Sequence, residues 1–167
     1  DLNLDLDRGV FLKRELRPEQ IDYLLNHDYV ESKHVPLDST THSTYLVKKI
    51  GNATIEHTFL TYVIYHEILK YTKEVIVDWE SRKESVNPDI VFTNSKREKV
   101  AIEVETGTNL KHHKVYLDKK RRRLNEEFES SWIIVLTHSD WKTRYETLFE
   151  VPVLLRQDMT RWVKDQF

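Results

Sequence analysis

Three short strand-like segments follow one another between two long helical segments, and this order constrains the fold more than any other feature of the chain. Apolar residues recur every three or four positions over residues 53–71, which predicts an amphipathic helix. Residues 74–79, 89–93 and 99–105 are rich in β-branched side chains, and their spacing suits an antiparallel meander. A second long helix is expected over residues 109–128. This order is typical of a sheet that carries helices on its faces.

The remainder of the chain continues the alternation. A strand is expected over residues 132–137, a helix over 141–149, a short strand over 151–155 and a helix at the end. The sequence therefore predicts an α/β (α+β) fold, in which an αβββαβ core forms a mixed sheet with helices on both faces. A chain of 167 residues can bury one sizeable core, so we assign residues 51–167 to one domain.

Residues 1–50 have a different pattern, that of a short helix followed by a hairpin. The helix is expected over residues 18–27, with Pro18 at its first position, and the two strands over residues 29–34 and 43–48. A helix followed by a hairpin resembles the second half of a winged helix-turn-helix, with the hairpin as the wing. An equally good interpretation is a decoration that packs on the main domain.

Carboxylates stand at the ends of two of the strand-like segments. Glu103 and Glu105 lie two positions apart, so they share one face of a strand whose other residues are apolar, and Asp89 begins the preceding strand. Buried carboxylates without a partner are costly, so they need a cation. The chain contains no cysteine, and oxygen ligands favour Mg²⁺ or Mn²⁺. These acids therefore predict a metal site.

A strongly basic run follows these acids, although the net charge of the chain is only −2. Residues 111–123, KHHKVYLDKKRRR, hold seven Lys and Arg against the single acid Asp118. A helical wheel drawn from Leu110 places Lys114 on the same side as Leu117 and Leu124, so Lys114 is the lysine expected to point at the sheet. The other basic residues are expected to bind the phosphate backbone of a nucleic acid: Lys111, Lys119, Lys120, Arg121, Arg122 and Arg123.

Residues 51–137 resemble the PD-(D/E)xK nuclease superfamily, which has the restriction-endonuclease-like fold. The resemblance lies in GNATIE with Glu56 in the first helix, in the Pro-Asp pair at Asp89, and in EVE with Glu103 and Glu105. The chain departs from the pattern at Glu105, where lysine is usual, although some restriction enzymes of this fold carry Glu there. A narrower resemblance is to the replication-relaxation proteins of mobile plasmids, and it involves Glu56-His57, Trp79-Glu80, Pro88-Asp89, Glu103-Val104-Glu105 and Gly107-Thr108.

The resemblance implies a metal-dependent DNA endonuclease or DNA-processing domain of a mobile element. Its catalytic residues would be Asp89, Glu103, Glu105 and Lys114. The Mg²⁺ or Mn²⁺ would be bound by Asp89 and Glu103, with Glu56 or Glu80 completing the shell. The implied partners are DNA, a relaxase or replication protein, and a second copy of the chain in a homodimer.

Two other functions remain open on the sequence alone. The domain could be a catalytically inactive module of the same fold that binds DNA or a relaxase partner, or a structural interaction domain whose basic helix is solvated. The chain has no membrane-spanning run, no signal pattern and no cysteine, so we expect a cytoplasmic protein without a membrane partner. It begins at Asp1, and its only methionine is Met159, which predicts a fragment of a longer protein.

Overall fold

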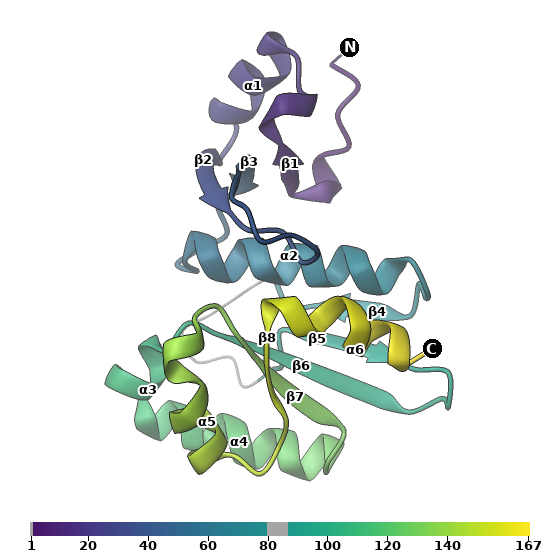
Figure 1. The fold of residues 1–167 in the computed structure, drawn as a ribbon, viewed down its shortest axis with the longest axis vertical. Helices are drawn as coiled ribbons and strands as arrows, with labels where there is room; N and C mark the ends of the chain where they lie inside the picture. Colours follow the sequence, from purple (N-terminus) through teal and green to yellow (C-terminus); the bar gives the residue numbers. More distant parts are fainter. Residues whose placement is uncertain (1, 80–86) are drawn as a thin grey trace.

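The computed structural model describes residues 2–79 and 87–167 (Figure 1). In these residues the chain forms six α-helices and two sheets, one of three strands and one of five. The elements, in chain order, are β1 (Val10–Leu12), α1 (Pro18–Leu25), β2 (Tyr29–His34), β3 (Ser43–Lys48), α2 (Ile55–Leu69), β4 (Val75–Val77), β5 (Ile90–Thr93), β6 (Lys99–Glu105), α3 (Thr108–His112), α4 (Lys114–Phe128), β7 (Trp132–Leu136), α5 (Lys142–Leu148), β8 (Val153–Leu155) and α6 (Met159–Asp165).

The larger sheet has the strand order β4-β5-β6-β7-β8 and is mixed, as the sequence predicts. The antiparallel meander of β4, β5 and β6 is confirmed, because a tight turn at Asn94 reverses the chain between β5 and β6. Helix α4 then crosses the sheet, so β7 returns parallel to β6, and β8 is parallel to β7.

Helices cover both faces of this sheet (Figure 1). Helices α2 and α6 pack on one face, where Ile90, Ile102 and Ile133 meet Ile64 and Met159. Helices α4 and α5 pack on the other face, where Ala101 and Ile134 meet Leu117, Leu124 and Tyr145. Strand β6 is consequently buried along both faces from its second residue to its last. Any acid on β6 is therefore removed from water, which is the condition that makes its charge costly.

Residues 1–50 form the smaller antiparallel sheet, in the order β1-β3-β2, with α1 between β1 and β2 along the chain. The predicted hairpin of β2 and β3 is confirmed, and β1 is a strand that the sequence pattern did not indicate. This sheet shares a hydrophobic cluster with α2, in which Val10 and Val47 contact Phe59 and Tyr62. Gly9 lies against the Tyr62 ring with a φ of 65°, so a larger residue would not fit there.

The loop between β2 and β3 folds onto the main sheet instead of projecting into solvent. Leu37 is buried in the same cluster as Ile64, Ile68 and Met159. Nη1 of Arg156 donates hydrogen bonds to the carbonyl oxygens of Pro36 (2.6 Å) and Ser39 (2.9 Å). A free wing would leave this loop exposed, so the contacts favour the interpretation of the hairpin as a unit that packs on the main domain.

The single long helix expected over residues 109–128 is wrong in one respect. The chain forms two helices, α3 and α4, which are separated at His113 by a non-helical backbone with φ −137° and ψ 48°. The break changes the direction of the helix, so that Leu117, Leu124 and Phe128 of α4 are all buried against the sheet. Gly107, with φ 91°, makes the turn that ends β6. Glycine is needed at this position, because a side chain there would collide with Trp141.

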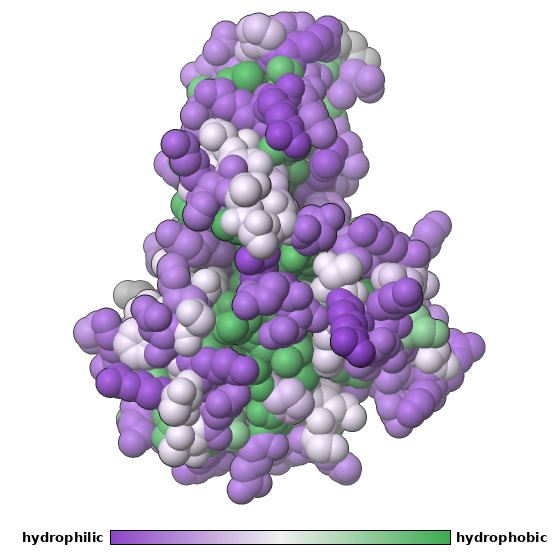
Figure 2. Space-filling view, viewed as in Figure 1, coloured by the Kyte–Doolittle hydropathy of each residue, from purple (hydrophilic) through white to green (hydrophobic). Residues whose placement is uncertain are grey.

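The surface in Figure 2 is mainly hydrophilic, and apolar residues show mostly near β8 at one edge of the sheet. Within residues 2–79 and 87–167, no helix has both the length and the apolar character that crossing a bilayer requires.

We expect Arg156→Ala to destabilise the protein by roughly 2 kcal/mol, because it leaves half-buried carbonyl oxygens without their charged donor. The measurement is the midpoint of urea denaturation, with Arg161→Ala as the control, since the Arg161 side chain is 91% exposed. An equal stability of the two variants would show that the hairpin loop does not depend on this contact.

Candidate functional site

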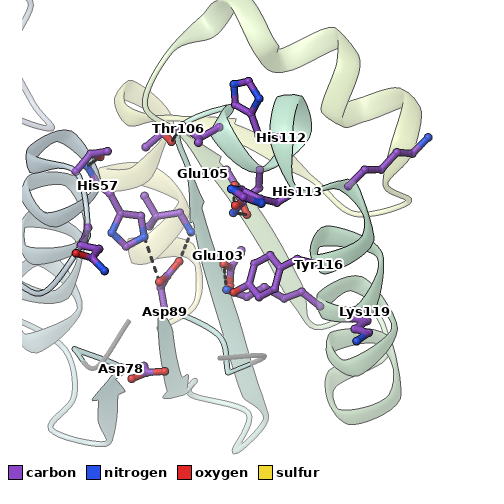
Figure 3. A pocket seen from close by; sticks show the side chains of 18 of the residues that line it. His57, Asp78, Asp89, Glu103, Glu105, Thr106, His112, His113, Tyr116 and Lys119 are labelled. Carbon is purple, nitrogen blue, oxygen red and sulfur yellow. Dashed lines mark hydrogen bonds and ion pairs between the residues drawn. The ribbon is translucent and has the colours of Figure 1, made fainter. Parts of the chain in front are cut away.

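A pocket of about 870 Å³ opens between the start of α2 and the α3–α4 break (Figure 3). It lies where β5 begins and β6 ends. Four carboxylates line it, from Asp78, Asp89, Glu103 and Glu105. The basic and histidine side chains of the lining come from the two helical walls: His57, His112, His113, Lys114, Lys119 and Lys120. Acids on the sheet thus face lysine and histidine side chains on the helices.

Asp89, Glu103 and Glu105 are brought together as the sequence predicts. Their exposed fractions are only 7%, 4% and 2%. Ile90 pairs with Ile102, so Asp89 and Glu103 stand opposite each other on adjacent strands. Oδ2 of Asp89 accepts a hydrogen bond of 2.8 Å from the backbone N–H of Val104, which fixes the Asp89 carboxylate against β6.

His57 reaches the site from the first turn of α2. The hydroxyl of Thr54 caps this helix by accepting a hydrogen bond from the backbone N–H of His57. Nε2 of His57 then lies 3.2 Å from Oδ1 of Asp89. A dashed line marks this contact in Figure 3. Burial alone would lower the pKa of His57, but the Asp89 carboxylate outweighs this effect and the pKa is raised.

Lys120 is the lysine of the site, and this corrects the expectation for Lys114. The Lys120 ammonium forms an ion pair with Oε1 of Glu103, and the residue is only 6% exposed, whereas Lys114 is an exposed residue on the pocket wall. The helical wheel could not separate the two lysines, because Lys114 and Lys120 lie on opposite flanks of the apolar side of α4. The packing of α4 on the sheet buries Lys120 and leaves Lys114 exposed in the first turn. The sequence analysis also expected Lys120 to bind the phosphate backbone of a nucleic acid at the protein surface. Because Lys120 is buried, this expectation is wrong for Lys120.

Glu105 is held by two donors on the other side of the site. The hydroxyl of Tyr145, a fully buried residue of α5, donates to Oε2 of Glu105 at 3.2 Å. The side-chain amide of Asn109 in α3 lies 3.3 Å from the same oxygen. The position that is lysine in the resembling family is therefore a carboxylate with its own hydrogen-bonding partners.

Burial and neighbouring charges give the three acids of the site different pKa values. Burial raises the pKa of Glu103 well above its usual value and the nearby Asp89 carboxylate adds to this effect, while the paired Lys120 ammonium acts to lower it. Burial likewise raises the pKa of Glu105 to about 7. Burial also acts to raise the pKa of Asp89, but His57, Lys120 and the Val104 N–H outweigh it and bring the pKa to about 2. Burial would lower the pKa of Lys120, yet Glu103 and Asp89 raise it, so the ammonium stays charged.

The remaining predicted ligands are not part of this cluster. Glu56 is exposed and does not line the pocket. Its charge acts on His34 of the smaller sheet, where burial lowers the pKa and Glu56 only partly offsets this effect. It is His57, one position further along α2, that points into the site, because successive helix residues differ in direction by about 100°. Glu80 lies outside the described residues.

The predicted DNA-binding residues separate into three groups. Lys119 lines the pocket, and Lys111 lies over the Trp141 ring at 4.9 Å. Arg121 donates to the carbonyl oxygen of Leu148 at the α5 side. Arg122 and Arg123 are exposed on α4, with Arg123 near Glu127 at 3.2 Å. The basic run is thus partly a pocket wall, partly a structural contact and partly a free surface.

Sequence reasoning missed Asp78, which follows β4 and lines the pocket. Its backbone N–H donates to the carbonyl oxygen of Asp89 at 2.9 Å, so it extends the pairing of β4 with β5. Asp78 falls directly opposite Asp89 once Val77 pairs with Ile90. Only a prediction of the register of β4 against β5 could therefore have found it.

The donor set suits a hard cation. Oε2 of Glu103 is buried and has no hydrogen-bonding partner among the described residues. Carboxylate oxygens are the ligands that Mg²⁺ and Mn²⁺ prefer, so Asp89 and Glu103 fit such an ion. In the part of the chain that the structure describes, no three Asp, Glu or His side chains are already arranged to hold a metal. Lys120 is the cation that accompanies Glu103 in this arrangement.

Comparisons with protein-family models, with curated proteins and with solved structures gave no significant match to this chain.

We expect the thermal stability of the metal-free protein to fall between about pH 4.5 and pH 7. The folded state raises the pKa of Glu105 from 4.5 to about 7, so it binds this proton more tightly than the unfolded chain. The stability from this group is complete below the unfolded pKa and is lost as the pH rises through the folded pKa, a change of roughly 3 kcal/mol. Melting temperatures in buffers with a chelator test this.

The matched variants are Glu105→Gln, which removes the titrating group, and Glu126→Gln on the exposed side of α4. The first should flatten the fall in melting temperature over this pH window, and the second should leave it as in the wild type. An unchanged slope in Glu105→Gln would contradict the assignment.

Proposed function

We propose that the chain is a metal-dependent phosphodiesterase that acts on DNA, an endonuclease of the restriction-endonuclease-like fold. The observation that carries this proposal is the group of three buried carboxylates with a buried lysine at the floor of an open pocket. Burying four ionisable side chains is costly and serves no packing purpose, so a catalytic use is the best explanation. The proposed fold agrees with the antiparallel β4-β5-β6 meander followed by a crossover helix and the parallel strand β7.

Each residue of the site has a role in this proposal. Asp89 and Glu103 would hold the Mg²⁺ or Mn²⁺, which when bound polarises a phosphate and lowers the pKa of water. Lys120 would move from Glu103 toward the phosphate and stabilise the negative charge that develops there. Glu105, with a pKa of about 7, is suited to accept a proton from the attacking water near neutral pH.

The walls of the pocket favour an anionic polymer as the substrate. His112, His113, Lys114 and Lys119 line one wall, and no acid occurs in the first turn of α4. Arg122 and Arg123 continue the positive charge along the exposed side of α4. These residues would contact phosphates and carry no sequence information, which predicts sequence-tolerant binding that weakens with salt.

One observation favours the second candidate, a nuclease-fold module without catalysis. The Lys120 ammonium already occupies Oε1 of Glu103, so the acids have a counterion without a metal. Such a module would still bind DNA or a replication partner through α4. The two candidates therefore differ in metal binding and cleavage, and they agree in DNA binding.

We expect the wild-type protein to bind Mn²⁺ in calorimetric titrations and to nick supercoiled plasmid DNA in the same buffer. Asp89→Asn should lose both, because it removes a ligand that is anchored to β6. Lys120→Met should lose at least about 100-fold in cleavage rate, as expected when a group that stabilises transition-state charge is removed.

Lys142→Met is the matched control, because the Lys142 side chain is 42% exposed, lies near Glu146 on α5 and does not line the pocket. It should cleave like the wild type. A wild-type protein that binds DNA but neither binds Mn²⁺ nor yields a product would contradict the nuclease and support the binding module.

A further inference from the structure

Exposed ring and apolar side chains stand among the lysines of one pocket wall. Val115, in the first turn of α4, is 73% exposed, and of the large apolar residues exposed in the described chain it alone lines the pocket. His112 and His113 precede it, are also exposed, and have ring centroids 6.5 Å apart. Contacts with phosphate need charge and hydrogen-bond donors, so binding of the DNA backbone does not explain an exposed valine here.

The negative charge of the pocket is confined to the side of the sheet. Among the described residues, all four acids that line the pocket belong to the strands of the main sheet or follow one directly. Residues 52–54 and His57 form the wall at the start of α2 and include no acid. Figure 3 shows His57 on one side of the acids and His113 and Tyr116 on the other. A nucleic-acid strand between these two walls would therefore meet no negative charge until it reaches the floor.

The depth of the acids favours a single strand over a duplex. Asp89, Glu103 and Glu105 are only 7%, 4% and 2% exposed, so a reacting phosphodiester has to enter the pocket. Double-stranded DNA is stiff over about 150 base pairs, and its phosphates cannot move into a pocket independently of the duplex. The pocket of about 870 Å³ is of the size that encloses a small ligand, which suits a short stretch of one flexible strand.

We infer that the substrate is DNA that is single-stranded where it enters the pocket, with its bases stacked on the wall of His112, His113 and Val115. This inference rests on the proposed function and names the strandedness of its substrate. Bases in a duplex present only their edges in the grooves, whereas unpaired bases offer their faces to rings and apolar side chains. Lys114 and Lys119 beside these side chains would bind the phosphates of the same strand. The two imidazole rings thus have a role in addition to phosphate contact.

The test compares a single-stranded oligonucleotide of about 12 nucleotides, a length within the site sizes of single-strand grooves, with the duplex of the same sequence. Binding to the whole chain is measured by fluorescence anisotropy in chelator, which prevents metal-dependent cleavage. We expect the wild type to bind the single strand at least about tenfold more tightly than the duplex, because stacked bases add affinity. In Mn²⁺, supercoiled plasmid should be nicked faster than the same plasmid linearised, since negative supercoiling favours strand separation.

Three variants separate stacking from charge. His113→Ala should weaken single-strand binding about tenfold and duplex binding much less, and His113→Phe, which keeps a ring without a charge, should retain the single-strand affinity. Lys119→Ala should weaken the binding of both substrates by similar factors, because it removes a phosphate contact. The matched control is His42→Ala, which removes an exposed histidine outside the pocket and should bind both substrates like the wild type. Melting temperatures show whether each variant is folded.

The outcomes separate this inference from the proposed function. Equal or tighter binding of the duplex, or an unchanged single-strand affinity in folded His113→Ala, overturns the inference and leaves the nuclease proposal standing. An equal loss in His113→Phe and His113→Ala also overturns it, since stacking would then not be the cause. A preference for the single strand without Mn²⁺ binding or cleavage supports the inference and contradicts the nuclease. If neither substrate binds, both proposals are wrong. If His113→Ala does not fold, Val115→Ser replaces it and its result has the same meaning.

Discussion

The ion pair between Lys120 and Glu103 is the interaction on which the site depends. Both side chains are more than nine-tenths buried, one on α4 and one on the central strand β6. Each charge alone would be expensive to bury, so each requires the other, and together they fix how α4 lies on the sheet. The apolar contacts of Leu117 and Leu124 beside this pair exclude water from it. The pocket can therefore hold charge at its floor and still be part of a packed core.

The smaller sheet supports the site from a distance. It packs Val10 and Val47 against Phe59 and Tyr62 of α2, the helix that carries His57. The loop held by Arg156 joins it to the C-terminal part of the main sheet. Helix α1 carries Glu19 and Asp22 and no basic residue, so it is poorly suited to lie against phosphates. These contacts indicate that residues 1–50 position α2 in this chain, and they argue against a free DNA-reading wing.

Local patterns predicted most of the helices and strands and the three acids Asp89, Glu103 and Glu105. Alternation along one strand and periodicity along one helix involve only residues that are close in the sequence, so both can be recognised without a structure. Glu103 and Glu105 share a face of β6 for this reason. Lys120 and Asp78 could not be predicted in the same way. Periodicity places Lys114 and Lys120 equally close to the apolar side of α4, so only the packing of α4 on the sheet decides that Lys120 is buried. The position of Asp78 depends on the register of β4 against β5. His57 takes the place expected for Glu56 because successive helix residues differ in direction by about 100°, which a motif match cannot resolve.

Glu105 stands where the nucleases that the sequence resembles usually have lysine, and its surroundings in this structure suit a carboxylate. The Tyr145 hydroxyl and the Asn109 amide nitrogen both donate toward Oε2 of Glu105, so these two partners satisfy a buried carboxylate at this position. The buried positive charge beside these acids comes from Lys120 of α4, which pairs with Glu103. Because burial brings the pKa of Glu105 to about 7, this carboxylate can take up a proton near neutral pH, while Lys120 stays charged.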